Sequence, residues 1–165
     1  MPRFTVLVIL HLFSVSHGLC AAEFSEISFE TDDDATIYAN LYGTGEHALI
    51  LAHGAIFNKE SWHALSTALA EDGLQVLAID FRGYGKSKPR SRSSGMYLDL
   101  LAVIEFLSNQ GAKRASMLGV SMGGGAASQS VVEARSSELN KLILLAPVRV
   151  VSPKRLHGNK LFVVS

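Results

Sequence analysis

Ser121 has the sequence context that most clearly indicates chemistry. It lies at the centre of the pentapeptide from Gly119 to Gly123, which has the pattern G-x-S-x-G and is followed by four more small residues. A serine on a sharp turn between a strand and a helix has a strained backbone, and only small residues two positions away tolerate that turn. The hydroxyl then projects away from the sheet, and the amide of Met122 at the helix start can bind a developing oxyanion. The pentapeptide therefore predicts a nucleophilic serine.

Two earlier segments each consist of apolar residues followed by a turn that contains glycine. The first has the sequence LILAHGA and places His53 and Gly54 directly after a strand-like run. The second has the sequence AIDFRGYGKS, and its turn begins at Asp80. Glycines permit compact loops at the ends of strands. We expect both turns to lie at the rim of the site that contains Ser121.

These three segments resemble, in order and spacing, the motifs of the α/β-hydrolase family. The resemblance extends from about residue 27 to the end of the chain. It implies a nucleophile elbow at Ser121 that depends on Gly119 and Gly123. It also implies an oxyanion hole formed by two backbone amides, those of Ala55 and Met122.

The resemblance gives the other polar residues of these motifs a structural role. His53, Gly54 and Asp80 are expected to support the site from nearby, because a catalytic histidine must lie beside the serine with its own carboxylate partner. Arg82 is expected to organise its loop. No metal and no other cofactor is expected, since no two histidines have the spacing of a metal-binding pair.

The catalytic partners of Ser121 are not found where the resemblance would place them. In this family an acid follows a later strand and a histidine follows the last strand. After Ser121 the chain contains two acidic residues, Glu133 and Glu138, and one histidine, His157, which precedes the final apolar run. We therefore expect a shortened hydrolase that is nearly inactive by itself, because a serine hydroxyl without a general base is a poor nucleophile at neutral pH.

The function that the motifs favour is hydrolysis of esters or related acyl compounds through an acyl-enzyme at Ser121. A peptidase or thioesterase of the same family is the alternative within this class. A non-catalytic exported protein that binds ligands on a hydrolase scaffold is the alternative from another class. The expected partner is a small-molecule acyl substrate. The formal net charge of zero gives no indication of nucleic acid as a partner, and nothing in the sequence indicates an oligomeric state.

The elements that would position these residues form an α/β pattern. Two strands, at 27–29 and 36–42, predict an N-terminal β-hairpin. Continuous apolar runs predict five strands buried on both faces, at 48–52, 75–79, 115–120, 142–145 and 161–164. Helices are predicted at 59–72, 96–108 and 122–135, the first with Trp62, Leu65, Ala68 and Leu69 on its buried side. The alternation predicts a three-layer αβα domain with a mostly parallel sheet, an incomplete α/β-hydrolase fold.

The first residues have the features of an export signal rather than of a folded element. Arg3 precedes a mostly apolar run, and small residues at Cys20 and Ala22 suit cleavage before Glu23. We expect a signal peptide at 1–22, a single domain at 23–165 and a secreted or periplasmic protein without stable membrane insertion after cleavage. Because Cys20 is the only cysteine, the mature chain would contain no disulfide and no thiolate nucleophile.

Overall fold

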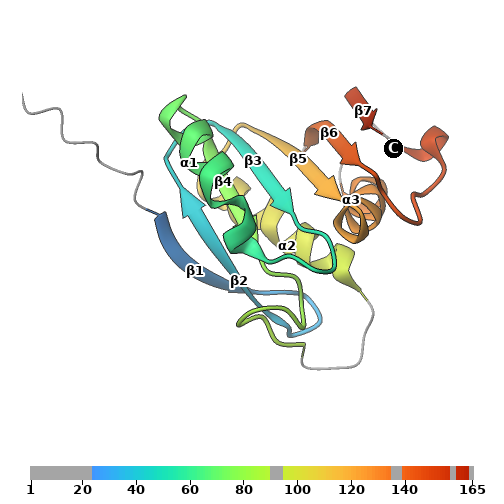
Figure 1. Ribbon diagram of the computed structural model, residues 1–165, viewed down its shortest axis with the longest axis horizontal. Helices are drawn as coiled ribbons and strands as arrows, with labels where there is room; N and C mark the ends of the chain where they lie inside the picture. The colour runs from blue at the N-terminus through green and yellow to red at the C-terminus, as the bar shows by residue number, and fades with distance from the viewer. Residues whose placement is uncertain (1–23, 90–94, 135–138, 157–158, 164–165) are drawn as a thin grey trace, which may run out of the picture.

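The computed structural model describes residues 24–89, 95–134, 139–156 and 159–163. The expected signal peptide, Glu138 and His157 lie outside these ranges, so export and the domain boundary stay predictions. The described residues form a seven-stranded sheet in the order β1-β2-β4-β3-β5-β6-β7, with helices on both faces (Figure 1). This architecture confirms the predicted three-layer α/β fold with a mostly parallel sheet.

The N-terminal hairpin is present and extends the sheet at one edge. Its strands β1 (Phe24–Glu30) and β2 (Thr36–Tyr42) are antiparallel, and β2 also pairs antiparallel with β4. The turn between them is closed by a hydrogen bond from the Thr31 amide to the Ala35 carbonyl, and Asp34 has φ 62°. Aspartate tolerates this left-handed conformation better than most residues, and it therefore suits this position of the turn.

The remaining five strands are parallel, and their carboxyl ends share one edge of the sheet. They are β3 (His47–Ala52), β4 (Gln75–Ile79), β5 (Arg114–Val120), β6 (Leu139–Leu145) and β7 (Asn159–Val163). Burial on both faces is observed for β4 and nearly all of β3, whereas β5 and β6 alternate. For β7 the prediction is wrong, because all five of its residues are exposed. It lies at the sheet edge, beyond β6 (Figure 1).

The helices divide between the two faces of the sheet. A 3-10 turn, η1 (Lys59–Trp62), leads into α1 (His63–Glu71), which packs on β4. The helices α2 (Met96–Asn109) and α3 (Met122–Glu133) pack together on the opposite face, and a short turn, η2 (Pro153–Arg155), precedes β7. The larger core lies beneath α2 and α3, and a smaller core of Tyr42, Leu49, Leu51, Val76 and Ala78 lies beneath α1. Two cores on opposite faces make the three layers.

The helix α1 presents a different side to the sheet than the sequence predicts. Trp62 and Leu69 pack on the core as predicted, but Leu65 is 39% exposed, Ala68 is exposed and Ser66 is fully buried. Positions 62, 66 and 69 share one helical face. At the start of the segment, the buried Lys59 is bound to Asp80.

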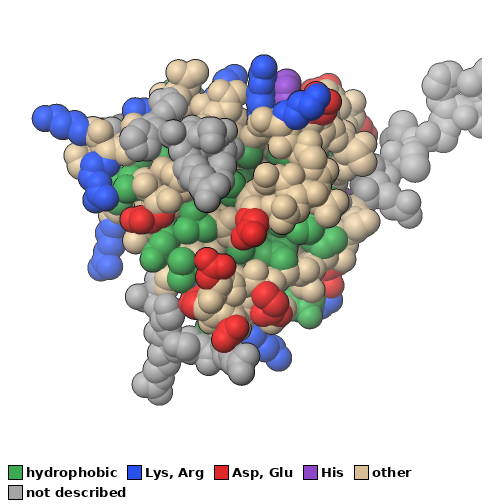
Figure 2. Space-filling model, turned by 180° about the vertical axis from the view of Figure 1, so that it is seen from behind, with side chains coloured by type: hydrophobic (Ala, Val, Ile, Leu, Met, Phe, Trp, Pro, Cys, Tyr) green, Lys and Arg blue, Asp and Glu red, His purple; other side chains and the backbone are tan. Residues whose placement is uncertain are grey.

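The surface seen from behind the view of Figure 1 carries charges of both signs. Figure 2 shows acidic and hydrophobic side chains interspersed over this face, with lysine and arginine side chains mainly toward its margin. Such mixing agrees with the zero formal net charge. Within the described ranges, no helix is both long enough and apolar enough to cross a membrane.

Candidate active site

The backbone turns sharply at Ser121, between the end of β5 and the start of α3. Ser121 has φ 50° and ψ −113°, a combination that residues with a side chain rarely adopt. Its amide donates to the Leu145 carbonyl (3.0 Å), and its carbonyl accepts from the amides of Gly125 (3.2 Å) and Val148 (3.1 Å). These hydrogen bonds hold the strained residue from three segments. The side chain stands at a turn and not inside a regular helix.

The glycines around Ser121 are required by close backbone packing. A Cβ atom on Gly119 would lie 2.6 Å from the Gly123 carbonyl oxygen. One on Gly123 would lie 2.5 Å from the His53 carbonyl oxygen and would also overlap that of Ala52. Real Cβ atoms essentially never come this close to backbone atoms. The two glycines therefore let α3 start directly against the ends of β3 and β5.

The two expected oxyanion donors come from different segments, one from the start of α3 and one from the loop after β3. Met122 is the first residue of α3, where a backbone amide has no partner within the helix. Ala55 is exposed in the loop after β3, and a Cβ built on the preceding Gly54 would lie 3.6 Å from Ser121 Cβ. Neither amide donates a hydrogen bond to another group in the described part of the chain. The loop that contains Ala55 thus borders the serine with an unengaged amide.

His53 supports the loop and has no nitrogen left for proton transfer from Ser121. The side chain is fully buried. Its Nδ1 lies 2.8 Å from the Gly54 carbonyl oxygen, and its Nε2 accepts a hydrogen bond from the Phe81 amide (3.2 Å). Since Nε2 accepts, Nδ1 bears the proton and the ring is neutral. Burial lowers the pKa of His53, although the Gly54 carbonyl opposes that shift.

Asp80 ties the other end of the same loop to the end of β4. Its carboxylate accepts the Lys59 amide (2.8 Å) and the Lys59 ammonium (2.9 Å), and both side chains are buried. Burial by itself would lower the pKa of Lys59, but hydrogen bonds to Glu60 and Asp80 raise it well above its ordinary value. The loop from His53 to Lys59 is therefore fixed to β4 at both ends.

Arg82 joins two further segments next to this site. It donates to Asp33 in the hairpin turn through both terminal nitrogens (2.6 and 2.8 Å). Its backbone amide and Nε donate to the fully buried Asp99 of α2 (2.9 and 2.8 Å). A hydrogen bond from Arg82 holds the pKa of Asp33 far below its ordinary value, whereas burial raises the pKa of Asp99. These contacts give Arg82 a role in organising its loop.

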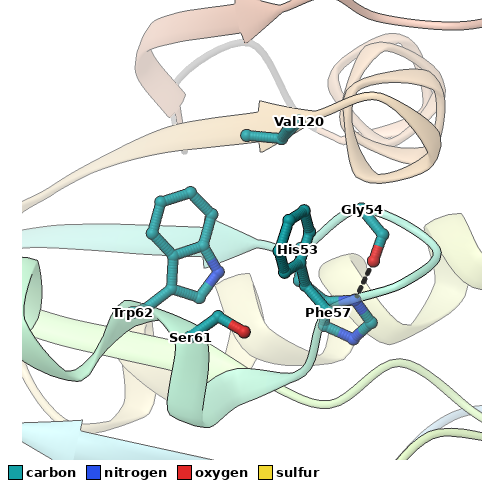
Figure 3. Close-up of a pocket in the computed structure, with 6 residues that line it drawn as sticks. All are labelled: His53, Gly54, Phe57, Ser61, Trp62 and Val120. Atoms are coloured by element: carbon teal, nitrogen blue, oxygen red, sulfur yellow. Dashed lines mark hydrogen bonds between the residues drawn. The ribbon is translucent and has the colours of Figure 1, made fainter.

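A small cavity opens beside Ser121 on the α1 side of the sheet. It has a volume of about 160 Å³ and is lined by His53, Gly54, Phe57, Ser61, Trp62 and Val120. Figure 3 shows the Trp62 indole and the Phe57 ring on either side of this space, with Val120 above. Val120 immediately precedes the serine, and Gly54 lies against it. The cavity therefore lies next to the turn that contains Ser121.

Several residues of this site were not foreseen from the sequence. Nothing in the sequence around Phe57 singles it out, the charge of Lys59 gives no sign of burial, and the helical pattern that places Trp62 on a buried side does not predict a cavity. Tyr84 belongs to the glycine-rich turn, but the turn pattern does not predict where its side chain points. Its hydroxyl donates to the Met122 sulfur (3.4 Å), and its ring packs on His53. Contacts between separate loops leave no local signal in the chain.

No described histidine is placed to act as the base for Ser121. His53 is engaged through both nitrogens, as described above. His63 Nδ1 pairs with the Tyr42 hydroxyl (3.1 Å), and His47 starts β3 at the opposite end of the parallel sheet from Ser121. Glu133 is at the far end of α3 from Ser121. The described residues therefore include no histidine that is placed to accept a proton from Ser121.

Comparison with known proteins agrees with this geometry. Residues 44–163 match the family model of serine aminopeptidases of family S33. The chain is 33% identical over 115 residues to Protein ABHD14A of Danio rerio, a match that covers 66% of this chain and 42% of that protein. It is 32% identical over 110 residues to a 2-hydroxy-6-oxononadienedioate/2-hydroxy-6-oxononatrienedioate hydrolase of a Pseudomonas species, covering 63% of this chain and 38% of that one.

Solved structures have the same fold over about half of their length. The esterase from Exiguobacterium antarcticum superposes with a TM-score of 0.65 at 27% identity, over 81% of this chain and 50% of that structure. A Pyrococcus furiosus esterase superposes with a TM-score of 0.67 at 24% identity, over 76% of this chain and 51% of that one. The chain spans about two fifths of the length of the curated relatives named above. With the strained serine at the β5–α3 turn and a family match over most of its residues, this chain belongs to the α/β-hydrolase family.

Proposed function

We propose that this chain contributes the nucleophile and the oxyanion hole of a serine hydrolase that cleaves esters or related acyl compounds. The conformation of Ser121 is the observation that carries the proposal, because strain of this kind persists only where the surrounding structure imposes it. Ser121 Oγ attacks the carbonyl carbon, and the alcohol leaves to give an acyl-enzyme. Water then attacks that ester and releases the acid and the free serine.

Each of the two attacks forms a tetrahedral intermediate with a negatively charged oxygen. We assign the binding of this oxyanion to the amides of Ala55 and Met122. Two backbone donors directed at one oxygen stabilise charge that develops in the transition state, and losing one such donor in another hydrolase costs about 100- to 1,000-fold in rate. The buried contacts of His53 and Asp80 hold the Ala55 loop in place. Fixed donors need no rearrangement when the oxyanion forms.

Ester hydrolysis is favoured over the aminopeptidase activity that the name of the matched family suggests. An aminopeptidase must bind the α-ammonium group of its substrate, for which a carboxylate is the natural partner. None of the residues that line the described cavity is acidic. Asp80, whose buried side chain follows β4, is already paired with Lys59. The cavity is therefore suited to an uncharged substrate.

Residues 24–163 alone are expected to react slowly, because the described residues include no base for Ser121. Oxyanion stabilisation and binding without the other triad members give about 10³-fold acceleration over water in a serine protease. The proposed activity at full rate requires a histidine from outside the described residues. His157 precedes the final apolar run, which is not where the family's histidine is expected, and it lies outside the described ranges.

Labelling with a fluorophosphonate probe tests the proposal. The 165-residue chain should become phosphonylated at Ser121 in a slow, time-dependent reaction, located by peptide mass spectrometry. Ser121→Ala removes the reactive oxygen and should abolish labelling, and Ser116→Ala on β5 is the matched control that should not. Absence of labelling after long incubation favours the non-catalytic binding protein, and labelling at another residue contradicts the assignment of the nucleophile.

A further inference from the structure

The cavity beside Ser121 is lined by rings and an aliphatic side chain, and its polar side-chain atoms are engaged or covered. Both ring nitrogens of His53 are in hydrogen bonds with backbone groups. The hydroxyl of Ser61 donates to Asn58 Oδ1 (3.2 Å) and accepts the Asn58 amide (3.3 Å). The Trp62 Nε1 is shielded from solvent and has no hydrogen-bond partner among the described residues. A ligand in this cavity thus meets little besides apolar surface.

The size of the cavity limits what can fill it. Its volume is about 160 Å³, and an apolar cavity of about 150 Å³ in another protein holds one benzene molecule. The space therefore suits a group of roughly six non-hydrogen atoms. Phe57 and Trp62 present two aromatic rings to it, and ring pairs gain attraction beyond the burial of area. A planar ring fits this lining better than a flexible chain of the same volume.

We propose that this cavity binds a phenyl-sized arm of the substrate that bears no polar substituent, a proposal that rests on the hydrolase function proposed above. The arm enters between Phe57 and Trp62, and Val120 and Gly54 place it next to the reacting serine. A hydroxyl or charged group on the ring would lose its hydrogen bonds to water and gain no side-chain partner, because the polar atoms of His53 and Ser61 are engaged and the Trp62 Nε1 is shielded. The site thereby selects aryl esters whose ring carries no polar group.

The single tryptophan of the chain provides a direct readout, because Trp62 is part of the cavity wall. Its emission is followed while esters are added to the Ser121→Ala variant, which cannot consume them. Methyl phenylacetate should give a saturable change. Methyl 4-hydroxyphenylacetate, which differs by one hydroxyl, should bind roughly 10-fold more weakly because that hydroxyl is buried without a partner. Benzyl acetate carries the ring on the alcohol half, so the tighter of the two unsubstituted esters identifies which half enters the cavity.

Two substitutions locate the binding site. Phe57→Ala removes one ring wall and should weaken binding of methyl phenylacetate by roughly 5-fold or more. Phe57 is 49% exposed, so this variant is expected to stay folded. Phe162→Ala is the matched control: Phe162 is 38% exposed on β7 and pairs in register with Leu144, whose side chain is buried in the core beneath α2 and α3. It should bind like the parent.

The proposal is overturned if no saturable change in Trp62 emission occurs, if the hydroxylated ester binds as tightly as the plain one, or if Phe57→Ala binds like the parent. These outcomes are independent of the chemistry at Ser121. A chain that binds the ester but resists the fluorophosphonate retains the cavity assignment and loses the hydrolase function. A chain that is phosphonylated but binds no ester retains the function and loses the cavity assignment.

Discussion

Replacing Lys59 with methionine removes the cation that neutralises the buried carboxylate of Asp80. The Lys59 side chain is 3% exposed and that of Asp80 is fully buried, and their charged atoms are 2.9 Å apart. Removing one member of a buried ion pair costs about 3–5 kcal/mol, because the other charge stays buried without compensation. For a chain of this length that loss corresponds to a fall in melting temperature of about 6–20 °C. The loop that contains Ala55 should loosen in the same variant.

Urea unfolding, followed by the emission of Trp62 and by circular dichroism, measures this loss. Lys113→Met is the matched control, since Lys113 and its partner Glu46 are 68% and 62% exposed and should leave the midpoint unchanged. Adding Asp80→Asn to Lys59→Met should restore most of the stability, because the amide oxygen can still accept the Lys59 backbone N–H without a buried charge. The reasoning is refuted if Lys59→Met unfolds within about 1 kcal/mol of the parent, or if the double variant is no more stable than the single one.

Three further substitutions have expected outcomes. Gly123→Ala places a Cβ against the carbonyl oxygens of Ala52 and His53 and should cost about 1–3 kcal/mol in urea unfolding; an unchanged midpoint contradicts it. Because the pKa of His53 is lowered in the folded chain, the buried imidazole is protonated only at a pH below the ordinary histidine pKa of about 6.5. The resulting stability is complete above that pH and is lost as the pH falls, at up to about 1.4 kcal/mol per unit; His53→Gln should remove this dependence, and an equal pH dependence in both chains disproves it. Asp99→Asn weakens two buried hydrogen bonds from Arg82 and should lower the free energy of unfolding by about 1.5–3 kcal/mol. Thermal unfolding measures this loss, and an unshifted midpoint would contradict it.

The elements nearest the site could be predicted because their signals are local. The apolar run at 75–79 is strand β4 at both ends, and helix α2 starts at Met96 as its periodicity indicates. The turn at Ser121 follows from two glycines whose necessity depends on close neighbours in the chain and on the adjoining strand end. Features that depend on neighbouring residues can therefore be predicted from a short stretch of sequence.

The features that could not be predicted depend on packing between distant segments. The exposure of β7 is set by what lies beside it in the sheet, and its apolar sequence alone resembles that of a buried strand. The segment that leads into α1 is held by the pairing of Lys59 with Asp80, which are separated by 21 positions. The aromatic walls of the cavity come from a loop and a 3-10 turn. No periodic pattern marks Phe57, and the helical spacing that places Trp62 on a buried side does not predict a cavity.

The most direct test of the central claim is a crystal structure of the chain after reaction with a fluorophosphonate. The account predicts phosphorus bonded to Ser121 Oγ, with the phosphonyl oxygen about 2.7–3.1 Å from the amide nitrogens of both Ala55 and Met122. A phosphonate on another residue, or an oxygen directed away from both amides, would contradict it.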